Sequence, residues 1–210
     1  MGIRTVTILI FVIIFLMVSI LFHLPVSVRF SVGKAPPGTC KFVFNNTMLN
    51  YTMYVEYWNG SLIYRGRGWY LVATGARDFA MGGLELEYSN GTRRSVEIAG
   101  VEKDGAFLMT GYHQPLIYTL DVACDIYLQY LRGQLPTPYE VKREGGKVVV
   151  VTRYSSSGYA RYEWSGNVLT RFIYDVKYPN GVRIVEELTL HEQKPYDEKL
   201  YEAVLQKLGR

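Results

Sequence analysis

Few side chains in this sequence stand at spacings that build a catalytic centre. His113 in TGYHQP and His191 in LTLHEQ are isolated, and neither has a nucleophile beside it for which it would act as a base. The run Ser155–Ser157 lacks the Gly-x-Ser-x-Gly pattern that holds a nucleophilic serine on a sharp turn. No clustered histidines, cysteines and carboxylates stand at metal-ligand spacing. We therefore expect no enzyme activity, no cofactor and no metal site.

The glutamates differ in how they fit the apolar pattern around them. Glu85 and Glu87 alternate with leucines, which is typical of a strand with one solvated face. Glu186 instead falls in phase with Ile184 and Leu188, on the apolar side of its segment. We expect a β-bulge at this point to turn the carboxylate of Glu186 outward. The alternative is that this carboxylate points into an apolar concavity, where an unpaired charge is costly.

Four Asn-x-Ser/Thr sequences have the chemistry of N-glycosylation acceptors, which matters only for a domain outside the cytoplasm. They begin at Asn45, Asn50, Asn59 and Asn90. Chance predicts fewer than four such sequences in a chain with this serine and threonine content. The alternative is that they are a coincidence of a turn-rich chain, because serine and threonine are common beside Asn-Gly turns. Asn59-Gly60 and Asn90-Gly91 are typical of two-residue hairpin turns. A hairpin tip exposes its asparagine, so one feature can serve as both turn and acceptor.

The chain has two cysteines, which stand at Cys40 and Cys124. An even pair with no Cys-x-x-Cys and no histidines nearby favours a disulfide over a metal site. The alternative is two separate buried thiols, which behave as small apolar side chains. We expect a Cys40–Cys124 bridge. Like the sequons, a disulfide favours a domain outside the cytoplasm.

Residues 5–24, TVTILIFVIIFLMVSILFHL, form an apolar run without a charged side chain. About 20 residues in a helix span about 30 Å, the thickness of the hydrocarbon core of a bilayer. The apolar region of a cleaved signal peptide is shorter, and HLPVSVRF offers no good cleavage site. We therefore expect an uncleaved signal anchor over residues 1–24 and a juxtamembrane linker over 25–39. Flanking charges do not decide the orientation, but the sequons and cysteines favour a single-pass cell-membrane protein with its globular domain outside the cytoplasm.

After the linker, apolar and polar residues alternate with the period of a β-strand. In VLTRFIYDVKY, for example, Phe172 and Tyr174 share one face and Asp175 lies on the other. Asn-Gly and Pro-Asn-Gly turns separate such segments. The pattern predicts an α+β, mostly β fold in which residues 40–194 form one large antiparallel sheet.

Two segments of this part of the chain are predicted to be helical. Residues 115–132 carry Leu120, Ala123 and Tyr127 on one apolar stripe, with a proline in the first turn and a glycine after the last. This amphipathic helix is inserted between the halves of the sheet and should lie against it. Residues 195–210 form a helical C-terminal tail.

The segments GSLIYRGRGWYLV, at 60–72, and GNVLTRFIYDVKYPNGVRIVEELTLHEQKPYDEKLYE, at 166–202, resemble the periplasmic lipoprotein-carrier and lipoprotein-sorting family. The shared features are a strand, a Pro-Asn-Gly turn, a second strand and a following strap with proline, aspartate and an aromatic residue. The resemblance implies an open half-barrel with a helical lid that shelters acyl chains. This chain departs from the family because a membrane anchor replaces the cleaved leader and a helical tail follows the strap.

If the sheet is a half-barrel, the in-phase residues of two neighbouring strands line one wall of an apolar site, and the inserted helix lies opposite. The wall consists of Tyr162, Trp164, Phe172, Tyr174 and Val176, and the helix contributes Leu120, Ala123 and Tyr127. The 18 tyrosines of the chain fit a surface that is apolar at one end and wet at the other. The alternative is that they serve strand propensity alone.

Two classes of function follow from these predictions. The first is a membrane-tethered, extracytoplasmic binding module that holds a lipid or another apolar ligand. The second is a structural or accessory subunit whose anchor and sheet edge contact partner subunits. A large apolar cavity under the helix would favour the first, and a filled core with a bare strand edge the second. The net charge of +4 forms no basic stripe, so we expect no nucleic-acid partner.

Overall fold

The structure, a computed structural model, describes residues 40, 43–103, 106–110, 115–135, 138–154 and 157–208. The predicted anchor (1–24) and linker (25–39) lie outside the described residues. Within the described ranges, no helix combines the length and the apolar composition needed to cross a bilayer.

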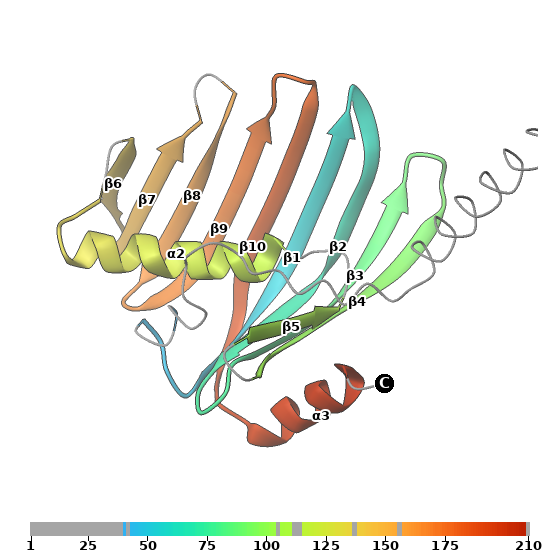
Figure 1. The fold of residues 1–210 in the computed structure, drawn as a ribbon. Coiled ribbons are helices and arrows are strands. Elements are labelled where there is room, and N and C mark those ends of the chain that lie inside the picture. The colour runs from blue at the N-terminus through green and yellow to red at the C-terminus, as the bar shows by residue number, and fades with distance from the viewer. Residues whose placement is uncertain are drawn as a thin grey trace, which may run out of the picture. The chain divides into compact units, whose positions relative to one another are not determined.

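The described strands form one ten-stranded antiparallel sheet in the order β5-β4-β3-β2-β1-β10-β9-β8-β7-β6 (Figure 1). The first meander comprises β1 (Thr47–Asn59), β2 (Ser61–Thr74), β3 (Phe79–Tyr88), β4 (Arg93–Lys103) and β5 (Ala106–Thr110). The second comprises β6 (Tyr139–Glu144), β7 (Lys147–Arg153), β8 (Gly158–Ser165), β9 (Val168–Lys177) and β10 (Val182–Pro195). The prediction of one large, open antiparallel sheet in a mostly β fold is confirmed.

Hairpins join successive strands where the sequence predicts them. Gly60, between β1 and β2, has a φ of 72°, and Gly91, between β3 and β4, has a φ of 82°. Residues with a side chain rarely adopt this left-handed backbone conformation, whereas glycine does so without steric cost. The two Asn-Gly sequons therefore lie at hairpin tips.

The predicted inserted helix is α2 (Pro115–Leu131). It connects β5 at one edge of the sheet to β6 at the opposite edge. The chain must therefore cross a face of the sheet, and α2 runs across the strands of the second meander (Figure 1). We call the face that α2 covers the inner face and the opposite one the outer face.

The outer face carries the C-terminal helix at one end and ion pairs elsewhere. Helix α3 (Glu198–Leu208) buries Tyr201 and Val204 against Phe79 and Val101 of β3 and β4. Further along the sheet, arginines pair with carboxylates on neighbouring strands. The pairs are Arg65 with Glu87, Arg171 with Glu187, and Arg183 with Asp175. Asp175 thus lies on the charged face, as the alternation predicts.

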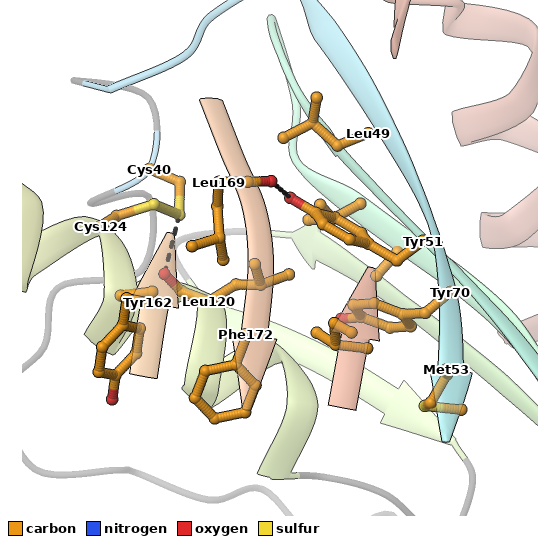
Figure 2. Packing of buried hydrophobic residues seen from close by; sticks show 14 of the residues in the cluster. Cys40, Leu49, Tyr51, Met53, Tyr70, Leu120, Cys124, Tyr162, Leu169 and Phe172 are labelled. Atoms are coloured by element: carbon orange, nitrogen blue, oxygen red, sulfur yellow. Dashed lines mark hydrogen bonds between the residues drawn. A yellow bond between two sulfur atoms is a disulfide. The ribbon is translucent and has the colours of Figure 1, made fainter. Parts of the chain in front are cut away.

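A disulfide joins Cys40 to Cys124 of α2, with sulfur atoms 2.11 Å apart (Figure 2). Both cysteines are buried in the inner-face core, together with Leu49 of β1. The predicted bridge is confirmed. It ties the segment that precedes β1 to the helix that crosses the inner face.

Tyr51 links two strands of the inner face that are not neighbours. It is fully buried on β1, and its hydroxyl donates a hydrogen bond of 3.0 Å to the carbonyl oxygen of Leu169 on β9 (Figure 2). We expect Tyr51→Phe to lower the free energy of unfolding by about 1–2 kcal/mol, because the buried carbonyl loses a donor. Urea unfolding measures the change. Tyr159→Phe, on the outer face, is the control, and an equal loss in both variants would contradict the assignment.

Candidate functional site

Among the described side chains, the interface between α2 and the sheet is a packed core. Leu120 and Ala123 are buried in it, and the ring of Tyr127 stacks on Trp164 with 4.4 Å between the ring centroids. The hydroxyl of Tyr127 donates to the carbonyl oxygen of Gly166 at 2.5 Å. Side chains from both sides therefore occupy the space that the sequence assigns to a ligand.

The structure gathers the predicted wall residues on the inner face, with unequal exposure. Tyr162, Phe172 and Trp164 belong to the buried cluster and are at most 3% exposed, and Val176 is also buried. Tyr174 is half-buried and packs against the cluster. The rings of Tyr162 and Phe172 lie side by side, with 5.2 Å between centroids (Figure 2). Of the predicted wall, Tyr174 is the residue that reaches the border of the core.

Two shallow hollows of the described surface lie on the outer face. One, of about 490 Å³, is bordered by Trp58, Tyr159 and Arg183, and the other, of about 350 Å³, by Arg67 and Glu85. Both carry arginines and carboxylates. Neither is an apolar cavity beneath α2.

Tyrosines border the inner-face core in two groups, which we call the tyrosine border. It consists of Tyr57, Tyr64 and Tyr88 on β1 to β3, and of Tyr154, Tyr174 and Tyr178 at the ends of β7 and β9. In the first group Tyr57 stacks on Tyr64 at 5.5 Å, and in the second the hydroxyls of Tyr174 and Tyr178 lie 2.7 Å apart. Tyr154 and Tyr178 are exposed. Apart from Tyr64, which is buried, the border thus consists of half-buried or exposed tyrosines.

Glu186 of β10 lies between the two groups of the tyrosine border. It is paired with Val55 of β1 and with Tyr174 of β9, and it is 7% exposed. The expected bulge at Glu186 is wrong, because the register with both neighbouring strands continues unbroken through this point. Glu187 consequently takes the outer face and accepts hydrogen bonds from Arg171. The carboxyl of Glu186 points to the inner face.

The environment of Glu186 is apolar. Burial raises the pKa of its carboxyl from 4.5 to about 7. Burial also raises the pKa of the Tyr174 phenol, the hydroxyl of Tyr178 adds to the rise, and the carboxyl of Glu186 contributes as well. The carboxyl and this phenol are therefore close enough to interact. Among the described residues, no hydrogen bond or ion pair to the carboxyl of Glu186 occurs.

The four sequons differ in their setting. Asn45 and Asn90 are exposed in a loop and a turn, and Asn59 is exposed at the last position of β1, whereas Asn50 lies inside β1. The side-chain oxygen of Asn50 is buried. Three sequons are therefore placed where a glycan has room, and the fourth lies in the paired centre of the sheet.

The sequence did not single out five of the six tyrosines in the border, and it gave the inward direction of the Glu186 carboxyl as the alternative to a bulge. Tyr57 and Tyr64 flank the Asn59-Gly60 turn, but a register shift beside Trp58 is what brings them opposite each other. The assembled chemistry is aromatic rings, hydroxyls and one carboxyl. The described residues contain no group of three or more histidines, cysteines and carboxylates arranged to hold a metal ion. No protein-family model and no curated protein matches this sequence, so a function must be inferred from the inner face itself.

Proposed function

We propose that this protein is a membrane-tethered, extracytoplasmic binding module that holds an apolar or amphipathic ligand at the tyrosine border. The observation that supports the proposal is this partly exposed aromatic border around a buried carboxyl. Aromatic side chains with a polar tip suit a place where one end of the ring is apolar and the other is wet. A ligand that covers these rings gains about 25 cal/mol for each Å² of apolar surface removed from water.

The ligand lies beside α2 in this proposal, because side chains fill the interface beneath the helix. Phe172 is 2% exposed, so a charge placed there would unfold the domain before it tested binding. Tyr57 and Tyr174 are half-buried on the inner face and keep surface available for contact. These two residues, one from each group of the border, are the better probes.

Three observations support the extracytoplasmic, membrane-tethered part of the proposal. The Cys40–Cys124 disulfide is typical of an oxidising compartment. Three sequons lie in exposed positions, and the apolar run at 5–24 has the length of an anchor. The open antiparallel sheet also agrees with a half-barrel of the lipoprotein-carrier kind, in which one face of the sheet shelters acyl chains.

The second candidate is an accessory subunit, and the filled interface beneath α2 favours it. Its partner would pair with the edge strand β6, where Val141 is 42% exposed. The same strand carries four charged side chains in six residues, a composition that discourages pairing with another chain. We therefore place the binding module first.

An uncharged, photo-crosslinkable monoacylglycerol tests the binding module on the detergent-purified full chain. We expect crosslinks at inner-face residues of β1, β9 and β10. The double variant Tyr57→Ser/Tyr174→Ser should reduce this labelling about tenfold, because two contacting rings are lost. The control is Tyr159→Ser, which removes a tyrosine from the outer face.

Thermal melting on the same preparations separates a loss of binding from a loss of folding. If the double variant melts cooperatively and is labelled as strongly as the wild type, the tyrosine border is not the site. If the wild type is labelled at 5–24 and not on the inner face, the accessory-subunit candidate takes first place.

A further inference from the structure

Glu186 has no cation paired with it among the described residues, in contrast to Glu87 and Glu187 on the outer face. On the outer face, Glu187 accepts from Arg171 at 2.6 Å, and Glu87 accepts from Arg65 at 2.8 Å. Glu186 is more deeply buried than either, yet no described side chain donates to it or carries a positive charge beside it. A buried carboxylate in this state lacks the partner that offsets its desolvation.

The groups around Glu186 determine which partner would suit it. Val55 and Tyr174 lie in register with it on the neighbouring strands, and Tyr57 lies one inner-face position beyond Val55. The faces of tyrosine rings attract cations, and a carboxylate forms its strongest hydrogen bonds with charged N–H donors. Both kinds of group favour a positive charge. An anionic head group would instead meet the carboxylate as a like charge.

We propose that the ligand is a cationic amphiphile, whose ammonium group binds the carboxyl of Glu186 and whose apolar part covers the tyrosine border. This inference rests on the proposed function, since it assigns a ligand class to the same site. The ammonium donates N–H bonds to the carboxylate, and the rings of Tyr57 and Tyr174 stand at its sides. The carbon chain extends over the partly exposed rings of the border.

Competition against the monoacylglycerol crosslinker tests the ligand class. The competitors are octylammonium, octanol and octanoate, which share a carbon chain and differ in charge. They are added to the full chain in nonionic detergent at pH 8, where the carboxyl of Glu186 is mainly ionised. We expect octylammonium to compete at an about tenfold lower concentration than octanol, because it forms a charge-assisted hydrogen bond. Octanoate should compete least.

The variants Glu186→Gln and Glu187→Gln are a matched pair, since they alter adjacent residues on opposite faces of β10. Glu186→Gln should abolish the preference for octylammonium, and Glu187→Gln should keep it. Equal competition by all three compounds in the wild type would overturn the inference and leave the binding module standing. An absence of inner-face crosslinks in the wild type would instead overturn the binding module itself. The wild-type series decides between these outcomes even if a variant fails to fold.

Discussion

Replacing Cys40 and Cys124 together with alanine lowers the free energy of unfolding by about 4–5 kcal/mol. The bridge joins residues separated by 84 positions, so it removes much conformational freedom from the unfolded chain. Both cysteines are buried in the inner-face core, and the loss of two sulfur atoms adds a smaller packing cost. Urea unfolding of the variant and of the wild type measures the difference.

Reducing agent provides the control for this disulfide prediction. It should destabilise the wild type to nearly the level of the double variant and leave the variant unchanged. Non-reducing peptide mapping of the wild type should recover the two cysteine peptides as one crosslinked species. Recovery of both as free thiols, or a stability loss below about 1 kcal/mol, would contradict the prediction.

Glu186→Gln makes the protein more stable than the wild type at pH 8, by about 3 kcal/mol. The pKa of this carboxyl is about 7 in the folded chain, against 4.5 for a free glutamate, and each pKa unit corresponds to about 1.4 kcal/mol. Below pH 4.5 the carboxyl is protonated in both states, so its ionisation costs the wild type nothing. As the pH rises to about 7, the unfolded chain loses this proton first, and the stability of the wild type falls.

The advantage of the glutamine variant should therefore be absent at pH 4, grow between pH 4.5 and 7 and then stay constant. The titratable group in register with Glu186 on β9 is the phenol of Tyr174, and burial raises the pKa of this phenol above its ordinary value, well above this range. The free energy of unfolding is measured against pH for both proteins. Subtracting the wild-type values from those of the variant removes the contribution of all other titratable groups. Glu187→Gln should show no such gain, since its carboxylate is paired with Arg171. A difference that does not depend on pH would mean that the carboxyl of Glu186 is not buried as described.

The local features of the fold could be predicted from the sequence, because each depends on neighbouring residues. Alternation set the faces of Phe172 and Asp175, the Asn-Gly pairs marked hairpin turns, and apolar residues at helical spacing marked α2. The pairing of β1 with β10 could not be predicted, since it joins segments far apart in the chain and no local pattern specifies the partner. The direction of the Glu186 side chain depends on the same non-local pairing. The register shift between β1 and β10 falls at Asn50 and Tyr51, away from Glu186.

The sequence predicted which residues of the candidate site share a face, but not how closely the helix and the sheet pack. The sequence placed Tyr174, Leu120 and Tyr127 on the correct apolar surfaces, but it could not show how much space remains between helix and sheet. The stacking of Tyr127 on Trp164 fills that space. Whether facing side chains leave a cavity depends on their volumes and rotamers in three dimensions, which hydrophobic spacing does not specify.

The central place of β1 and β10 has a consequence for how this protein is made. During synthesis, the first meander emerges while its innermost strand still lacks the neighbour that will later pair with it along 13 positions. That neighbour is the last strand to leave the ribosome, and contacts between segments so far apart form slowly. An open strand edge readily accepts a wrong partner in the meantime. Both cysteines are synthesised before β10. Their oxidation can therefore link α2 covalently to the segment before β1 while the strands of the second meander are still missing.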